Sequence, residues 1–507
     1  MDQLSMTTES PLALLASACR DVAKQTMKAS GRISAANRKR FAQYFTPMPV
    51  ARQMASMLDV PARAVVGDYG AGAGILGATV LGSSLANSAS TGTGSQLTLQ
   101  AYEIDDLLHE AFKNNMGRIG ELAAKLWQPA PETSLKGDFV PEAPAILEEG
   151  FRPFLDVAIL NPPYQKLKQT TDLAHLLRSK AAPTPNLYAA FILLAIECLK
   201  PGGQLVAIVP RSFCNGDYFK AFRGWLRCQG SIDWVVRYKR RSNVFRADNV
   251  LQENVVFRFR KAVPQAKLVR VSLSDDPECE PELDIHVARD DVLPLDDDRI
   301  YVPTSQEELE ALHRNRALPC TLGDLGVEIF TGKVEDFRHK DQLNPTPPES
   351  GAWAPLVYAH HWQRGSRKLE WSPSTKGKPA CLRLDGDVAS KRLVSPGHYV
   401  VLKRISANDD RTGRVHPAVV TPGCLPGATW AFENHVQVLG PVSGSELAPE
   451  LANGIAAFLA SPDVDRVLKT ISGTTQINCN DIRRLRFPTP EALIRMDPAS
   501  DRQHDAA

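Results

Sequence analysis

Short runs of apolar and β-branched residues alternate with helical stretches over residues 31–262, and this alternation limits the fold more than any other feature. Such an order is typical of a parallel sheet whose strands are joined by crossover helices. The predicted strands are Ala64–Asp68, Leu97–Glu103, Val157–Leu160, Gln204–Val209, Ile232–Arg237 and Asn254–Phe259. One interruption, Gly82–Gln96, is rich in Gly, Ser and Thr and is predicted to be a surface loop. The sequence therefore predicts an α/β fold for this part of the chain.

A change in character near residue 316 predicts a second domain, as does the length of 507 residues, which is too great for one ordinary core. Beyond residue 316, Pro and Gly become frequent and helices sparse, with one helix expected near Glu450–Leu459. The acidic residues 271–310 are predicted to connect the two domains. The predicted domains are a helical or loosely ordered lead-in over 1–30, an α/β domain over 31–315, a β-rich α+β domain over 316–495, and a tail over 496–507.

Cysteine usage and hydropathy exclude several classes of protein. No two of the nine cysteines are spaced as C-x-x-C, which argues against a zinc site or a disulfide framework and predicts no metal. A reducing cytoplasm fits this usage best. The N-terminus lacks a basic segment, and the longest apolar stretch, Ala189–Leu199, contains Glu197 and is too short to span a bilayer. We therefore expect a cytoplasmic protein with no membrane partner.

Two motifs that follow neighbouring predicted strands favour a nucleotide-like cofactor. The glycine-rich turn Asp68–Gly74 (DYGAGAG) lets the backbone approach a ligand at a helix N-terminus. Glu103 ends the next strand, where a carboxylate can accept hydrogen bonds from both hydroxyls of a ribose. A tight turn and a solvated carboxylate are the structural alternatives. Together the two motifs favour a cofactor that contains adenosine.

A third motif, Asn161–Tyr164 (NPPY), follows the strand Val157–Leu160. Its two prolines restrict the backbone and hold the Asn161 side chain at the edge of the sheet. The amide oxygen of Asn161 and the carbonyl of Pro162 can each accept one proton of an exocyclic amine, which leaves the nitrogen lone pair aimed at an electrophile. Tyr164 offers a flat face on which a planar base or amide can stack. A plain strand-ending turn is the structural alternative.

Taken in order, these motifs resemble those of S-adenosylmethionine-dependent amino-methyltransferases, in particular the gamma class of DNA adenine-N6 methyltransferases. Gln43–Pro47 (QYFTP) resembles the N-terminal motif with which that class clamps its cofactor, and Gly137–Phe139 (GDF) matches a further motif. Other matching stretches are Asn186–Phe191, Leu199–Gly203 and Val209–Phe213, so that the resemblance covers residues 41 to about 260. It implies a Rossmann-like class I methyltransferase domain with a mixed, mostly parallel seven-stranded sheet.

The second half resembles the target-recognition domains of type II modification methylases, of the PstI-like and XhoI-like kind. The matching stretches are Thr331–Arg338, Tyr399–Arg404 and Ile471–Asn478. The resemblance implies a site-specific enzyme that methylates N6 of an adenine in double-stranded DNA. It also implies a restriction-modification system with a separately encoded endonuclease, and a monomer associated with the nucleoid.

Roles for individual residues follow from the same resemblance. Glu103 would hold the ribose of S-adenosylmethionine and Asp138 its adenine amine. Asn161 and Pro162 would align N6 of the target for in-line attack on the methyl group. A target adenine that leaves the duplex would stack between Tyr164 and Phe245, which is otherwise a core residue. The implied cofactor-binding residues are Thr46, Pro47, Asp68, Gly70, Gly72, Glu103, Asp138 and Phe139, and the implied catalytic residues are Asn161, Pro162, Pro163 and Tyr164.

Four other functions share part of this pattern. A glutamine-N5 protein methyltransferase also uses NPPY, but it lacks a large C-terminal domain. An RNA amino-methyltransferase could use the same chemistry. A single-chain restriction-modification enzyme needs a nuclease domain, for which the chain before Tyr44 is too short. A catalytically silent DNA-binding subunit would not need intact glycine and NPPY motifs.

The net charge of +2 hides an uneven distribution. Residues 211–261 contain 12 basic and 4 acidic residues, and residues 360–420 contain 12 and 5, whereas residues 271–310 contain 2 and 14. Two basic segments in a cleft between the domains would suit a DNA duplex, with the acidic stretch facing away. The candidates for DNA contact are Arg364, Arg367, Lys403, Arg404, Arg411 and Arg414, for which a solvated surface is the alternative.

Overall fold

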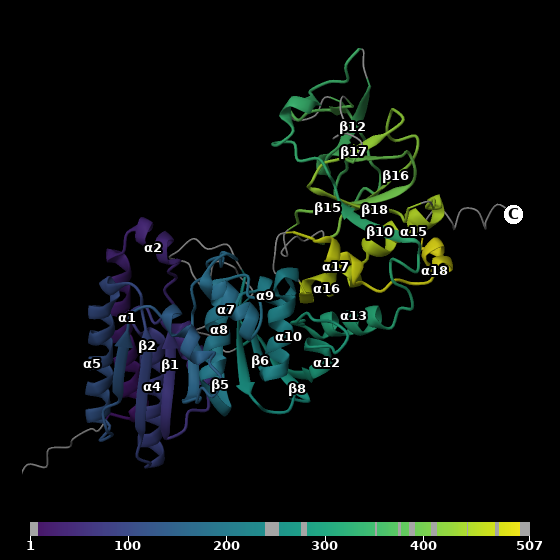
Figure 1. Ribbon diagram of the computed structural model, residues 1–507. Coiled ribbons are helices and arrows are strands. Elements are labelled where there is room, and N and C mark those ends of the chain that lie inside the picture. Colours follow the sequence, from purple (N-terminus) through teal and green to yellow (C-terminus); the bar gives the residue numbers. More distant parts are fainter. Residues whose placement is uncertain are drawn as a thin grey trace, which may run out of the picture. The chain divides into compact units, whose positions relative to one another are not determined.

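The chain divides into two units, Met1–Thr304 and Ser305–Ala507, in a computed structural model (Figure 1). The structure describes residues 9–238, 253–274, 281–349, 352–373, 377–384, 391–406, 413–443, 445–471 and 476–496. The predicted stacking residue Phe245 and the candidate Arg411 lie outside these ranges. Within them, no helix is both long and apolar enough to cross a bilayer.

The described part of the first unit is built on a nine-stranded sheet in the order β3-β2-β1-β4-β5-β7-β6-β8-β9. Strands β1 to β5 run parallel to their neighbours in this group, and β7 is antiparallel to both β5 and β6. The strands are β1 Arg63–Tyr69, β2 Gln96–Tyr102, β3 Glu132–Lys136, β4 Leu155–Leu160, β5 Leu199–Pro210, β6 Gly230–Tyr238, β7 Asn254–Lys261, β8 Leu268–Ser274 and β9 Leu283–Ala288. The fold is thus that of a class I methyltransferase sheet, extended by β8 and β9 beyond the seven predicted strands.

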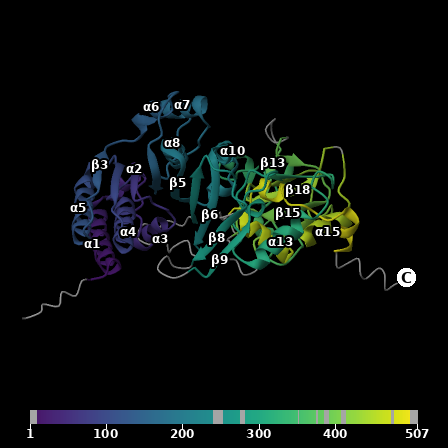
Figure 2. The same cartoon turned by 90° about the horizontal axis from the view of Figure 1, so that it is seen from below.

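Helices cover both faces of this sheet, and α4 and α8 lie on opposite faces (Figure 2). Helix α8 is apolar on all sides and almost wholly buried. The helices of the unit are α1 Pro11–Arg32, α2 Ala35–Phe41, α3 Met48–Ser56, α4 Ile75–Thr91, α5 His109–Lys125, α6 Ala143–Ile146, α7 Asp172–Lys180, α8 Leu187–Cys198, α9 Ser212–Asn215, α10 Lys220–Gln229 and α12 Arg289–Val292. A continuous hydrophobic core joins one face of the sheet to α1, α3, α4 and α5. This packing holds in place the strands that the sequence motifs follow.

Each of the six predicted strands is present, but two other predictions about this unit are wrong. Most of Gly82–Gln96 is not a surface loop, because α4 continues to Thr91 with Ser84 and Ser88 buried. The acidic residues 271–310 are not only a connector, because β8 and β9 add them to the sheet. The lead-in forms α1, which packs against α4 and α5.

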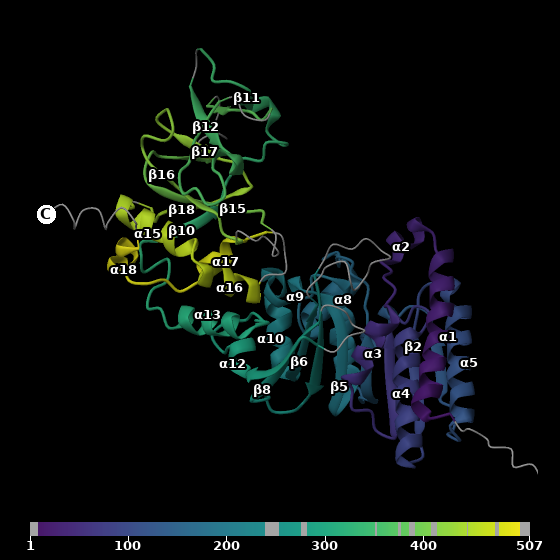
Figure 3. The same ribbon diagram turned by 180° about the vertical axis from the view of Figure 1, so that it is seen from behind.

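The described part of the second unit contains two small sheets and several helices (Figure 3). It begins before the predicted boundary at residue 316, because α13 packs against α16. The sheets have the orders β10-β18-β15-β16 and β11-β13-β12-β17-β14, and an aromatic core includes Trp362, Trp430 and Phe432. The strands are β10 Val327–Thr331, β11 Leu343–Asn344, β12 Trp353–Val357, β13 Cys381–Arg383, β14 Leu393–Val394, β15 Tyr399–Lys403, β16 Pro417–Val420, β17 Trp430–Phe432 and β18 Val436–Pro441. The helices are α13 Gln306–Arg316, α15 Pro449–Leu459, α16 Pro462–Ile471, α17 Cys479–Arg483 and α18 Pro490–Arg495.

Candidate active site

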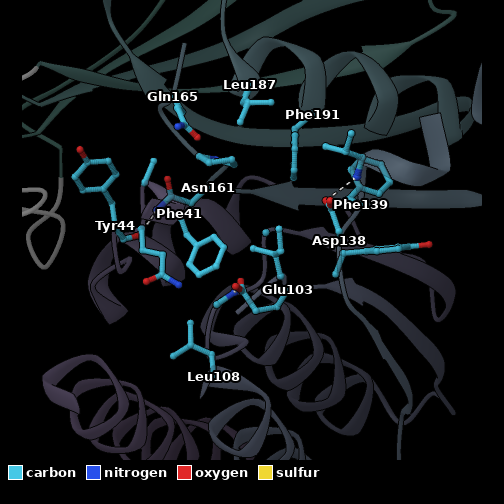
Figure 4. Close-up of a pocket in the computed structure, with 18 of the residues that line it drawn as sticks. Phe41, Tyr44, Glu103, Leu108, Asp138, Phe139, Asn161, Gln165, Leu187 and Phe191 are labelled. Atoms are coloured by element: carbon cyan, nitrogen blue, oxygen red, sulfur yellow. Dashed lines mark hydrogen bonds between the residues drawn. The ribbon is translucent and has the colours of Figure 1, made fainter. Parts of the chain in front are cut away.

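The carboxyl ends of β1, β2 and β4 border a cavity of about 370 Å³, which we name the first cavity (Figure 4). Because these strands are parallel, motifs that follow them in sequence meet at one edge of the sheet. Residues from the N-terminal segment 40–45 complete the wall. The predicted site residues that line the first cavity are Gly70, Gly72, Glu103, Asp138, Phe139, Asn161 and Pro163.

The glycine-rich turn lies directly against the end of β2. The backbone N–H groups of Gly70 and Ala71 both donate to the carbonyl of Tyr102, each at 2.9 Å. Gly72 has a φ of +58° and open space where a side chain would project. Only glycine adopts this conformation without strain, and its bare backbone leaves room for a ligand.

Glu103 faces this turn from the end of β2. One carboxylate oxygen, Oε2, accepts a hydrogen bond from the Gly72 N–H at 2.7 Å, and Oε1 accepts one from the Asp105 N–H at 2.8 Å. The side chain is buried, and burial raises the pKa of its carboxyl group. Each oxygen keeps a second lone pair, so this fixed carboxylate can still accept hydroxyl donors from a ligand in the cavity.

Asp68 lies behind the wall and not in it. It is fully buried, is absent from the lining, and accepts a hydrogen bond from the Gly77 N–H in the first turn of α4 at 2.9 Å. Its other oxygen, Oδ1, has no hydrogen-bond partner. Burial raises the pKa of Asp68 to about 7. The structure therefore gives Asp68 a contact with the helix start, and its role toward a cofactor stays a prediction.

Asp138 and Phe139 form another part of the wall. The Asp138 carboxylate accepts a hydrogen bond from the Val140 N–H at 3.0 Å, which holds the turn after β3. The Phe139 ring is buried, with its centroid 4.2 Å from that of Tyr69 and 5.3 Å from that of Phe191. A carboxylate therefore stands beside an immobilised aromatic surface in the same cavity.

The Asn161 side chain has one well-defined orientation. Its amide nitrogen Nδ2 donates to the carbonyl of Tyr44 at 2.9 Å and to the hydroxyl of Thr46 at 3.0 Å. Because a carbonyl can only accept, the nitrogen must face Tyr44. The amide oxygen Oδ1 then points elsewhere, and it is buried without a hydrogen-bond partner. Thr46 is buried, and neither Thr46 nor Pro47 lines the cavity, so Thr46 acts on Asn161 in this structure.

Tyr164 borders a different cavity, which we name the second cavity. Its volume is about 340 Å³, and its lining consists of Tyr164, Lys166, Pro185, Asn186, Tyr188, Pro210, Ser212 and Tyr218. The Tyr164 hydroxyl donates to the carbonyl of Ile208 at 3.2 Å, which holds the ring. Asn161 and Pro163 line the first cavity while Tyr164 lines the second, so the turn Asn161–Tyr164 borders both.

Two residues at this site had no individual role in the sequence analysis. Tyr44 places its ring centroid 5.3 Å from that of Tyr164, in addition to its backbone contact with Asn161. Gln43 lines the first cavity and donates to Asp105 at 2.8 Å. Both belong to the QYFTP motif, so the motif predicted that this segment is part of the site but did not predict the role of each side chain.

The candidates for DNA contact differ in exposure. Arg364 is exposed and Arg367 half-buried. Lys403 lies over the ring of Trp362 at 5.3 Å, and Arg404 donates to the Asn434 carbonyl at 3.0 Å. The prediction for Arg414 is wrong for this structure, because its side chain is completely buried and cannot reach a phosphate.

Much of the basic charge in residues 211–261 is neutralised inside the first unit. Arg211 pairs with Glu253 at 2.7 Å, and both side chains are buried. Arg223 pairs with Asp298, which belongs to the acidic stretch. Arg258 and Arg260 both pair with Asp233. The count of 12 basic residues in this segment therefore overstates the positive charge that it can offer to a ligand.

Comparison with known proteins places this geometry beside a group of DNA-modifying enzymes. Residues 98–245 match the family described as Eco57I restriction-modification methylase. The type II methyltransferase M.PstI of Providencia stuartii is 31% identical over 470 residues, which are 90% of this chain and 88% of that protein. M.BsuBI of Bacillus subtilis is 32% identical over 469 residues, or 91% and 90% of the two chains. The solved structure of the type IIL restriction-modification enzyme MmeI in complex with DNA is similar with a TM-score of 0.50 at 11% identity, over 93% of this chain and 65% of that chain.

Proposed function

Because the chain belongs to the type II methyltransferases of restriction-modification systems, we propose that it methylates N6 of an adenine in double-stranded DNA. The methyl donor is S-adenosylmethionine. One observation carries the choice of an exocyclic amine as the acceptor. The turn Asn161–Tyr164 separates two cavities and presents an amide oxygen, Asn161 Oδ1, that is buried and lacks a hydrogen-bond partner.

The first cavity fits the proposed cofactor. Glu103 would accept hydrogen bonds from the ribose hydroxyls, and Asp138 would accept one from the adenine amine while Phe139 packs beside the ring. The bare backbone at Gly70 and Gly72 leaves room for the remainder. When bound, S-adenosylmethionine supplies an electrophilic methyl group on a positively charged sulfur.

Residues of the NPPY turn would orient the target amine. The Asn161 amide oxygen and the Pro162 carbonyl would each accept one of its protons, so that the nitrogen lone pair is directed at the methyl carbon. The amine can lose its proton after transfer, so no general base is needed before attack. Catalysis would rest mainly on positioning, which Tyr44 and Thr46 support by fixing the Asn161 amide.

The second cavity is the proposed place for the target base. An adenine inside a duplex cannot reach Asn161, so it would leave the helix at a cost of a few kcal/mol. Stacking on Tyr164 would offset about 1–3 kcal/mol of this cost. We propose Phe245 as a second stacking residue on the basis of the sequence resemblance alone.

DNA contact outside the base is proposed for the second unit. Arg364 is exposed and Arg367, Lys403 and Arg404 are half-buried, so these four are the candidates that we propose. We further propose that the enzyme acts as a monomer in the bacterial cytoplasm, and that a separately encoded endonuclease cuts the same sequence when it is unmethylated.

Sequencing of modified bases tests this function directly. The protein is expressed in a bacterial host free of DNA methylation, and the genomic DNA is read for modified bases beside an empty-vector control. We expect N6-methyladenine in one short sequence context. N4-methylcytosine instead would contradict adenine specificity. Unmodified DNA together with a methylated glutamine in a release factor would favour the protein-methyltransferase alternative.

A further inference from the structure

The segment 42–47 that orients Asn161 donates a side-chain hydrogen bond to one buried carboxylate, that of Asp105. The Gln43 side chain donates through Nε2 to Oδ2 of Asp105 at 2.8 Å, and the Asn37 side chain on α2 donates to the same oxygen at 2.5 Å. Both donors come from more than 60 residues earlier in the chain. Asp105 is buried, so water competes little for these hydrogen bonds.

Asp105 is rigidly placed for this task. Its other oxygen, Oδ1, accepts the Leu107 N–H at 3.2 Å and so caps the short helix Asp106–Leu108. Its backbone N–H donates to Glu103 Oε1 at 2.8 Å. The carboxylate that would bind the ribose therefore accepts a hydrogen bond from the backbone of the residue whose own carboxylate anchors the N-terminal segment.

Capping the short helix does not account for this arrangement. The cap uses Oδ1 alone, whereas Oδ2 accepts two side-chain amides from a distant part of the chain. Hydrogen bonds to an ionised acceptor are shorter and stronger than neutral ones, which makes Asp105 an effective anchor. Beyond Gln43 lie the two acceptors that orient Asn161, the Tyr44 carbonyl and the Thr46 hydroxyl.

We propose that Asp105 is a positioning residue that, through Gln43, fixes segment 42–47 and with it the orientation of the Asn161 amide. This inference rests on the proposed role of Asn161 in methyl transfer. Loss of the anchor lets the Tyr44 carbonyl and the Thr46 hydroxyl move, so the Asn161 oxygen no longer faces the amine at the required angle. The rate of methyl transfer then falls, while Glu103, Asp138 and Phe139 keep their places in the wall of the first cavity.

A reciprocal exchange of amide and carboxylate tests the contact itself. Gln43→Glu keeps the side-chain shape but replaces the donor at 2.8 Å from Asp105 by a second carboxylate, which repels the first. We expect kcat to fall about 10- to 100-fold. In the double variant Gln43→Glu/Asp105→Asn, the new NH₂ group in place of Oδ2 can donate one proton to the new carboxylate at 43, and its second proton to the Asn37 amide oxygen once that amide is flipped. We expect this double variant to recover kcat to within a few-fold of wild type.

Three further measurements separate positioning from general damage. The melting temperature is expected to change little in Gln43→Glu, Asp105→Asn and the double variant. Because Gln43 also lines the first cavity, the calorimetric Kd for S-adenosylmethionine is measured beside kcat, and we expect the larger change in kcat. Asp106→Asn is the matched control, because the Asp106 side chain is 92% exposed and makes no contact with segment 42–47 that the structure records. We expect its kcat to equal that of the wild type.

Two results would overturn the inference while the proposed function stands. The first is wild-type kcat in Gln43→Glu. The second is a double variant no more active than the poorer single variant, since independent structural damage adds and does not cancel. If the wild-type enzyme itself produces no N6-methyladenine, the proposed function fails instead.

Discussion

The two cavities on either side of Asn161–Tyr164 are similar in volume but differ in chemistry. The first, of about 370 Å³, has the carboxylates of Glu103 and Asp138 in its wall. The second, of about 340 Å³, is lined by tyrosines, neutral polar groups and Lys166, with no acidic side chain among the described residues of its lining. Carboxylates suit hydroxyl and amine donors, whereas tyrosine rings suit a planar base. The difference indicates how one rigid turn can serve two unlike ligands.

Asn161 lines the first cavity and begins the turn that borders both cavities, so its variant is expected to have the largest effect. Asn161→Ala removes the acceptor for the target amine, and we expect methylation to fall by about 1,000-fold or more. Both cavities keep their other walls, so the calorimetric Kd for S-adenosylmethionine should change little. Asn161→Asp retains an acceptor oxygen but turns a second oxygen toward the Tyr44 carbonyl. Its activity should lie between that of the wild type and that of Asn161→Ala. Normal turnover by the alanine variant would contradict the proposed mechanism.

A change at Glu103 is expected to affect the first cavity alone. Both of its oxygens accept backbone N–H groups, so in Glu103→Gln one N–H must face the new amide NH₂. We expect the Kd for the cofactor to rise about 10- to 100-fold, the usual cost of losing a hydrogen bond to a charged group. Glu121→Gln, at an exposed position paired with Arg118, is the matched control. Equal cofactor affinity in both variants would show that Glu103 does not contribute to cofactor binding.

A change at Tyr164 is expected to affect the second cavity alone. Tyr164→Ala removes a stacking surface worth about 1–3 kcal/mol, so trapping of the extrahelical base should weaken by about 5- to 100-fold. Tyr164→Phe keeps the ring but loses the hydrogen bond to the Ile208 carbonyl, and it should bind the base nearly as well. The fluorescence of 2-aminopurine at the target position reports the trapped base. Identical fluorescence with the alanine variant would argue against a base in this cavity.

The first cavity was largely predictable because parallel strands bring their carboxyl ends to one edge. Glu103 and Asn161 follow β2 and β4, and the same rule that aligns those strands brings both residues to the cavity. The orientation of the Asn161 amide was not predictable, because it depends on Tyr44 and Thr46, more than 100 residues earlier in the chain. Spacing along the chain contains no information about which oxygen remains without a partner.

Composition misled the sequence analysis where packing decides the structure. The Gly- and Ser-rich stretch from residue 82 continues α4 because small residues let a helix pack closely, as at Gly82, where a Cβ would lie 3.0 Å from Leu15. Charge counts misled in the same way, since they do not show that Arg223 pairs with Asp298 inside the first unit. Local composition describes what a segment contains but not what it packs against.

Asp68 lies behind the wall of the first cavity. We therefore expect its variant to bind the cofactor and the target base with nearly unchanged affinity, but to differ from the wild type in how its stability depends on pH. Burial raises the pKa of Asp68 from 3.8 to about 7 in the folded protein. Between these values the folded state holds a proton that the unfolded state releases, so the free energy of unfolding falls as pH rises through this window. Asp68→Asn keeps an acceptor for the Gly77 N–H but cannot ionise, and it should escape this loss. The variant should therefore exceed the wild type in melting temperature by more at pH 8 than at pH 5.5. The increase should be about 2–4 °C for each kcal/mol of unfolding free energy that the wild type loses between these pH values. An advantage that does not change with pH would show that Asp68 ionises as readily in the folded chain as in the unfolded one.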